Sequence, residues 1–158
     1  MAGTVEQIFL ADPESPAHSV DSVLAIMGRG LEGDRHLASE QTWAPSGCAI
    51  SLIEAEEIEA IREGDGIDLG DGRSRRQLVT RGIRLNDLVG REFTVGEVRC
   101  RGVELCEPCQ HLSRLLGVPN LIEAALHRAG LRADILAGGR IAVGDSVLAA
   151  TEAPPALA

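Results

Sequence analysis

The stretch EFTVGEVRCRGVEL, residues 92–105, decides the fold of this chain. Apolar residues alternate with polar ones from Glu92 to Val95 and again from Val98 to Leu105, which is the pattern of half-buried β-strands. Gly96-Glu97 stands between the two runs and has the position of a hairpin turn. The sequence therefore predicts a β-hairpin in the second half of the chain.

Similar short runs occur along the whole chain and predict further strands at 4–11, 19–27, 48–53, 78–85, 131–137 and 140–148. Gly138-Gly139, between the last two, has the composition of a two-residue hairpin loop. One helix is predicted after a capping box at Ser51-x-x-Glu54 and ends near Gly64. A second runs from Asn120 to Arg128. About eight short strands with two helices predict a mainly β (α+β) fold, a barrel with peripheral helices.

Length and charge narrow the functional classes. The chain of 158 residues is long enough for one domain with a real core, predicted over residues 1–150, and residues 151–158 are predicted to be a disordered tail. All 15 basic residues are arginine, so a lysine Schiff base with pyridoxal phosphate and a phosphate loop ending in lysine are excluded. A net charge of −9 argues against sequence-blind binding to nucleic acid.

The sequence also carries hints about location. No apolar run has the length of a membrane span, and residues 1–14 lack the basic start and apolar stretch of a signal peptide. A cytoplasmic location is therefore predicted, without a membrane partner. In that reducing compartment the four cysteines are expected to be thiols, metal ligands or catalytic groups rather than structural disulfides.

A glycine-rich segment, residues 28–33, has the glycine spacing of a dinucleotide-binding loop. It is followed by a polar, proline-containing stretch instead of an apolar helix, so a turn or a binding loop is the better interpretation. Arg35, flanked by Asp34 and His36, could clamp a phosphate or carboxylate. A surface ion pair that stabilises the turn is the alternative.

Cys106-Glu107-Pro108-Cys109 is the densest chemical cluster, and His111 follows it closely. Two thiols at this spacing could share a metal or exchange a disulfide. A closed zinc site would need further ligands, and a thioredoxin-type pair would need a βαβ setting that this chain lacks. Inert, buried thiols are the alternative, and Cys48 and Cys100 on predicted strands fit it well.

The Cys106–Cys109 cluster belongs to a series of five motifs along the chain. They are GLEGDRH (30–36), RRQLV (75–79), LNDLVG (85–90) with FTVG (93–96), LCEPC (105–109) and GRIAVGD (139–145). Together, from about Val5 to Leu148, they resemble a stand-alone, small bacterial-type member of the MOSC family, named for the C-terminal domain of molybdenum cofactor sulfurases.

The resemblance implies a β-barrel that holds a molybdenum–pterin (molybdopterin) cofactor or handles sulfur through one cysteine. In relatives that reduce N-hydroxylated compounds, the second cysteine of the Cys-x-x-Cys stretch ligates molybdenum, and that position is Cys109 here. A thiolate suits both roles, because it is a soft metal ligand and the group that carries a persulfide.

The resemblance also implies the residues that surround the cofactor. Arg75 and Arg76 would hold the anionic pterin phosphate, and Asp34 and Arg35 would help to shape the pocket. Gln77 follows the two arginines at the position where the family commonly has asparagine. Because of this position, Gln77 is a further cofactor-binding candidate.

Three functions stay open at this stage. The first is a molybdenum-dependent oxidoreductase of small N-hydroxylated molecules, with Cys109 as catalytic metal ligand and a separate electron-donor protein. The second is a sulfur carrier, in which Cys109 accepts a persulfide from a cysteine desulfurase and delivers the sulfur to a metal cofactor. The third is a non-catalytic module in which Cys106, Cys109 and His111 hold zinc or simply pack.

Overall fold

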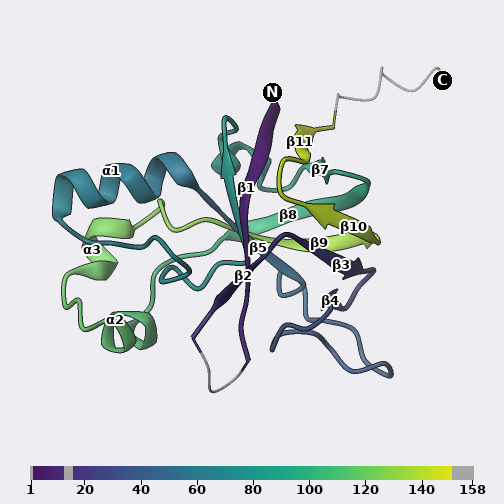
Figure 1. The fold of residues 1–158 in the computed structure, drawn as a ribbon, viewed down its shortest axis with the longest axis horizontal. Coiled ribbons are helices and arrows are strands. Elements are labelled where there is room, and N and C mark those ends of the chain that lie inside the picture. The colour runs from purple at the N-terminus through teal and green to yellow at the C-terminus, as the bar shows by residue number, and fades with distance from the viewer. Residues whose placement is uncertain (1, 13–15, 151–158) are drawn as a thin grey trace.

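The strands form a closed barrel in the computed structural model, which describes residues 2–12 and 16–150 (Figure 1). Seven of them close the ring. In ring order these are β1 (Ala2–Leu10), β6 (Leu78–Arg81), β5 (Ile50–Glu54), β9 (Leu131–Ala137), β8 (Val98–Leu105), β7 (Glu92–Val95) and β11 (Ser146–Ala149). β11 pairs back with β1, and β5 pairs in parallel with β6 while the other neighbours are antiparallel. The predicted mainly β barrel is confirmed.

The hairpin predicted at residues 92–105 is present as β7 and β8, and Val95 lies opposite Val98. Along β8, the residues Val98, Cys100 and Gly102 are buried in the barrel, whereas Arg99 and Arg101 between them are exposed. This alternation follows from the period of two along a strand, so the polar–apolar pattern set the register.

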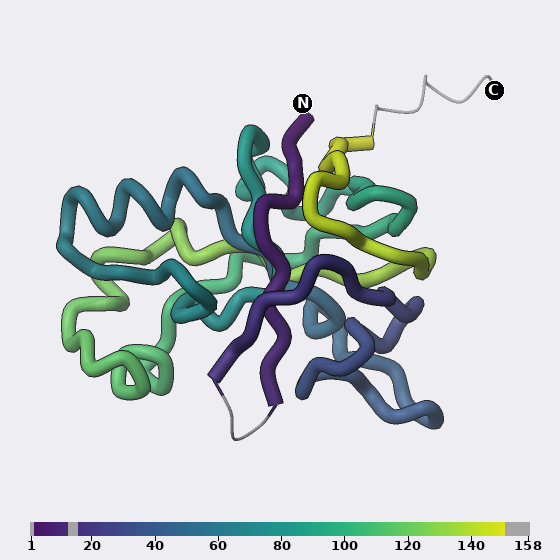
Figure 2. Tube along the Cα trace, viewed as in Figure 1, coloured from purple at the N-terminus to yellow at the C-terminus, as the bar shows by residue number. Residues whose placement is uncertain are grey.

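Three helices lie together on one side of the barrel, as Figure 2 shows, and none crosses its interior. They are α1 (Ala55–Asp65), α2 (Gln110–Leu116) and α3 (Leu121–Ala125). Successive residues of β5 serve two cores, because Leu52 points into the barrel and Ile53 packs under the helices with Ile61 and Leu121. β5 is therefore buried on both faces, which makes its start a rigid base for the site described below.

The capping box predicted at Ser51 does not form. Ser51 belongs to β5, and its backbone N–H and side chain pair with Gln77. α1 instead begins after Glu54 without a side-chain cap and extends to Asp65. Ser51 therefore pairs with Gln77, which is distant in sequence, and the local motif does not reveal this contact.

The two-residue hairpin predicted at Gly138-Gly139 is also wrong. The chain leaves β9 there and enters β10 (Gly139–Ala142), which pairs with β3 (Ser22–Ile26) in a separate sheet that also holds β4 (Gly30–Leu31). A Cβ atom on Gly138 would lie 2.6 Å from the carbonyl oxygen of Ala25. Glycine is required because two backbones come close, not because the chain reverses.

The region after the cysteine pair holds two short helices where one was predicted. α2 was not anticipated, and it ends at Gly117 in the left-handed conformation (φ 67°). α3 follows Asn120 but stops at Ala125, and His127 has a positive φ of 61°. The predicted last turn of the helix is therefore a bend.

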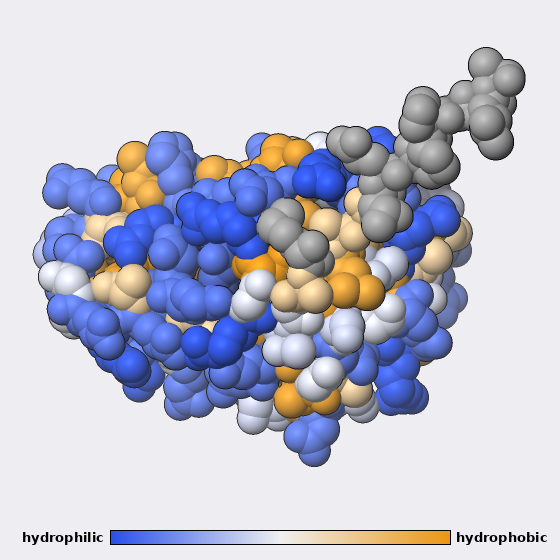
Figure 3. All heavy atoms as spheres, turned by 90° about the horizontal axis from the view of Figure 1, so that it is seen from above, coloured by the Kyte–Doolittle hydropathy of each residue, from blue (hydrophilic) through white to orange (hydrophobic). Residues whose placement is uncertain are grey.

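The outer surface and the ends of the chain complete the description. On the face seen in Figure 3, apolar residues form small patches among polar ones. Within residues 2–12 and 16–150, no helix has both the length and the apolar character to cross a membrane. The tail predicted at 151–158 lies outside the described residues.

Candidate functional site: an arginine-lined pocket

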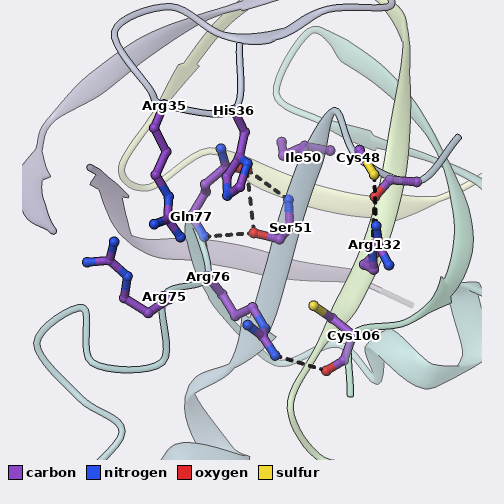
Figure 4. A pocket seen from close by; sticks show the side chains of 11 residues that line it. Arg35, His36, Cys48, Ile50, Ser51, Arg75, Arg76, Gln77, Cys106 and Arg132 are labelled. Carbon is purple, nitrogen blue, oxygen red and sulfur yellow. Dashed lines mark hydrogen bonds between the residues drawn. The ribbon is translucent and has the colours of Figure 1, made fainter. Parts of the chain in front are cut away.

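A cavity of about 220 Å³ opens beside the first residues of β5 and the residues of β9 that pair with them (Figure 4). The segment after β4 supplies Arg35 and His36, and the loop that leads into β6 supplies Arg75 and Arg76. Cys106 and Arg132 line the opposite wall, with Cys48 beside them. Segments far apart in sequence thus place four arginines and two thiols around one cavity.

A buried polar link between Asp34 and Gln77 holds this arrangement together. The Asp34 carboxylate accepts from the backbone N–H groups of Ala11 and His36, both at 3.0 Å, and from the Gln77 amide at 2.8 Å. The side-chain oxygen Oε1 of Gln77 accepts from the Ser51 backbone N–H at 2.9 Å. Both side chains are buried, and the hydrogen bond between them joins the segment that carries Arg35 to the segment that carries Arg76. Asp34 and Gln77 therefore position the walls of the pocket.

Arg76 is directed toward main-chain carbonyl groups. Its Nε donates to Ala129 O at 2.8 Å, and one terminal nitrogen donates to Cys106 O at 3.1 Å. The same nitrogen is 3.4 Å from Glu107 O. The guanidinium therefore anchors the Cys106–Cys109 loop to the pocket.

Arg75 differs from its neighbour because its side chain makes no hydrogen bond with any described residue, whereas that of Arg76 is bonded to carbonyl groups. The Nε atom of Arg75 is buried and has no hydrogen-bond partner among the described residues. Partial burial and the positive charge of Arg35 lower the pKa of Arg75. Arg75 also has a left-handed backbone (φ 64°), which is uncommon for a residue with a side chain. The fold thus places a guanidinium with an unpartnered Nε atom beside the positive charge of Arg35, and an anion could pair with both.

His36 shares this electrostatic environment. Partial burial lowers its pKa, and Arg35, Arg75 and Arg132 lower it further, against the opposing effect of Asp34. The His36 imidazole therefore stays neutral down to a lower pH than an ordinary histidine side chain, because adding a proton would place another positive charge among the arginines.

A larger cavity of about 450 Å³ adjoins the first and shares Arg35 and Arg75 with it. Its walls include His111, Leu115 and Leu116 of α2. The two arginines therefore stand between a polar pocket and a roomier one with apolar side chains.

Cys109 is exposed and is not among the residues that line either cavity. It caps α2, and its Sγ accepts from the Leu112 N–H at 3.5 Å. Cys106 lines the first cavity and His111 the second, so the segment that carries Cys109 borders both. Glu107 fixes this segment on its outer side through the His127 backbone N–H at 2.7 Å.

Comparison with known proteins shows which family the chain belongs to. The model of the MOSC domain matches residues 32–148. The chain belongs to the MOSC domain family. The match covers the pocket loops, the Cys106–Cys109 loop and most of the barrel, so the resemblance carried by the five motifs is confirmed. A search of curated proteins found no match.

Solved structures support the MOSC fold over nearly the whole chain. YuaD from Bacillus subtilis has a TM-score of 0.77 at 19% identity, over 93% of this chain and 94% of that one. YiiM from Geobacillus stearothermophilus has a TM-score of 0.73 at 16% identity, over 99% and 79% of the chains. YiiM from Escherichia coli has a TM-score of 0.71 at 16% identity, over 97% and 71%.

Two residues of the MOSC pocket were missed from the sequence. Arg132 was not singled out, and Cys48 was interpreted as an inert core thiol. Cys48 is half-buried, faces the pocket and accepts a hydrogen bond from Arg132 at 2.8 Å. The available signal was position, because Cys48 and Arg132 both stand next to the start of a buried strand.

A closed zinc site is not assembled in the described part of the chain. No group of three or more His, Cys, Asp or Glu side chains there is arranged to hold a metal ion.

The four thiols should differ sharply toward alkylation. Cys100 is fully buried in the barrel, and burial raises its pKa to about 12. We expect iodoacetamide at neutral pH to modify exposed Cys109 in the folded protein and to modify Cys100 only after denaturant is added. Peptide mass mapping measures both, and labelling of Cys100 in the native protein at the rate of Cys109 would contradict the described packing.

Proposed function

We propose that this MOSC domain binds a molybdenum–pterin cofactor and acts as an oxidoreductase of small N-hydroxylated molecules, with the Cys109 thiolate as the metal ligand. The observation that carries the proposal is the partly buried guanidinium of Arg75, whose buried Nε atom has no hydrogen-bond partner among the described residues, beside the positive charge of Arg35. A cofactor with an anionic phosphate supplies the charge that this cluster lacks.

The residues present fit such a cofactor. Arg75 and Arg35 would hold the phosphate, because both line the shared wall of the two cavities. Asp34 and Gln77 would act by positioning the loops that carry these arginines, and Arg76 by fixing the loop of Cys109. When bound, the cofactor would supply two-electron redox chemistry at its metal.

Cys109 would contribute a soft donor atom that is exposed to solvent. Capping by the Leu112 N–H orients its sulfur, and the anchored Cys106–Cys109 loop limits its motion. The apolar side chains of Leu115 and Leu116 in the larger cavity would exclude water from part of a bound small molecule. In this proposal a separate electron-donor protein supplies the electrons.

Removing the Arg75 charge should reduce cofactor occupancy. We expect Arg75→Gln, expressed in a host that makes the cofactor, to bind the pterin about tenfold more weakly and to be isolated with less of it than the wild type, since a charge-assisted hydrogen bond contributes about 1.5 kcal/mol or more. Pterin fluorescence after oxidative release measures the occupancy.

The matched control is Arg99→Gln, which removes an exposed arginine of β8 that pairs with Glu92 across 3.5 Å. It should keep the wild-type pterin content. Equal pterin in the Arg75 and Arg99 variants would contradict the assignment of Arg75 to the phosphate.

A sulfur carrier is the second candidate, and the exposure of Cys109 favours it. A cysteine desulfurase must bring its own persulfide to the accepting thiol, so the accepting thiol has to be reachable by a protein. If this candidate holds, incubation with a desulfurase and cysteine adds one sulfur atom to Cys109 in protein that contains no molybdenum. Intact and peptide mass spectrometry would detect the addition.

A further inference from the structure

Cys48 and Arg132 line the arginine pocket but have no part in the proposed function. An Arg132 terminal nitrogen donates to the Cys48 Sγ at 2.8 Å. The same guanidinium is oriented by Gly47 O at 3.3 Å and by the Glu104 carboxylate at 3.0 Å. A cation is thus fixed against the sulfur, and reactive cysteines are found in electropositive, partly exposed surroundings of this kind.

The cavity in front of Cys48 would select the charge of a reagent. Arg35, Arg75 and Arg132 line it, and the Asp34 carboxylate is already engaged by three donors. Clefts lined by one sign of charge concentrate ligands of the opposite sign. Small anions should therefore reach Cys48 more readily than neutral reagents of similar size.

The other thiols are less suited to this reaction. Cys100 is enclosed in the barrel core. Burial raises the pKa of Cys106, and this outweighs the opposing effect of Arg76 and Arg132. Cys109 is reachable but does not line the arginine pocket. Cys48 alone combines a cationic hydrogen-bond donor with a place in the pocket wall.

We propose that Cys48 is a second sulfur-reactive site of this domain, which takes the sulfane sulfur of a small anionic donor held by the pocket arginines. The proposal goes beyond cofactor binding, since it needs neither metal nor Cys109. Thiosulfate has the required chemistry: a double negative charge for the arginines and a terminal sulfur open to attack.

The reaction balances without an added oxidant. The Cys48 thiolate attacks the terminal sulfur of thiosulfate, and a new S–S bond forms at Sγ. The S–S bond of thiosulfate breaks, and sulfite leaves with the electron pair, facing Arg35 and Arg75. Cys48 then carries a persulfide. Cyanide, used as an acceptor, would take the outer sulfur as thiocyanate and restore the thiolate.

The first test follows the sulfur atom. The full chain as isolated, with its molybdenum content recorded, is incubated with thiosulfate, trapped with iodoacetamide and mapped by peptide mass spectrometry. We expect one added sulfur atom on Cys48, and thiocyanate release when cyanide follows. Cys48→Ser should lose both signals. Sulfur found on Cys109 or Cys106 instead, or on no cysteine, would overturn the proposal.

A second test separates recognition of the anion from simple access to the thiol. Arg75→Gln should slow persulfide formation by thiosulfate about tenfold, while neutral iodoacetamide labels Cys48 at the wild-type rate. Arg99→Gln should change neither rate. An equal slowing of both reagents in Arg75→Gln would mean that the arginine only maintains the fold, and the anion site would be rejected. Both measurements use wild-type Cys48, so they do not depend on the folding of Cys48→Ser.

Discussion

Asp34→Ala should lower the free energy of unfolding by about 3 kcal/mol, because it orphans buried donors that each cost about 1–3 kcal/mol when unpaired. The donors are the Ala11 N–H and the Gln77 amide, together with the partly buried His36 N–H. For a chain of this size the melting temperature should fall by about 10 °C. Thermal and urea unfolding followed by circular dichroism measure the loss.

Asp87→Ala provides the matched control. Asp87 lies in the single 3₁₀ turn Leu85–Leu88, is exposed, and makes no side-chain hydrogen bond with the described residues. Its replacement should change the unfolding free energy by no more than about 0.5 kcal/mol. Equal stabilities for the two variants would show that the Asp34–Gln77 link does not hold the pocket walls.

Asp34→Ala should also disturb the positions of the arginines in the pocket. Asp34 fixes the segment that presents Arg35 and His36, and Gln77 follows Arg75 and Arg76 directly. Without the carboxylate, the two arginine-bearing segments lose their cross-link. In the proposed function, Asp34 and Gln77 would therefore act on cofactor binding by positioning these segments.

The barrel could be predicted from sequence because its strands obey a local rule. The alternation of residues 92–105 carried directly into β7 and β8, with Val98 and Cys100 inside and Arg99 and Arg101 outside. Short apolar runs separated by turn residues were enough to locate most of the other strands.

The predictions of local structure are wrong where a residue's role depends on a contact with a residue distant in sequence. Ser51 has the spacing of a helix cap, yet it pairs with Gln77 across the parallel strands β5 and β6. Gly138 has the composition of a hairpin, yet its missing side chain makes room for Ala25 of another sheet. No local pattern records either contact.

The candidate site was only partly accessible from sequence for the same reason. Arg75 and Arg76 are adjacent in sequence but differ in role, since one guanidinium is unpartnered and the other is bound to carbonyl groups. Cys48 and Arg132 meet only because β5 and β9 are neighbours in the barrel. Motif spacing identified the Cys106–Cys109 loop but could not reveal which of its thiols lines the cavity.

Cys109→Ser should abolish molybdenum binding, which is the largest functional effect that the account predicts. A serine hydroxyl keeps the size and the capping position of the side chain but is a much poorer donor to a soft metal centre than a thiolate. Because Cys109 is exposed and lies outside both hydrophobic cores, the variant should keep the wild-type melting temperature. Loss of metal without loss of stability is therefore expected.

The most direct test is the molybdenum content of the wild type and of Cys109→Ser, both expressed in a host that makes the cofactor and measured by elemental mass spectrometry. We expect stoichiometric molybdenum in the wild type and none in the variant. Molybdenum retained by Cys109→Ser, or absent from the wild type, would contradict the proposed function.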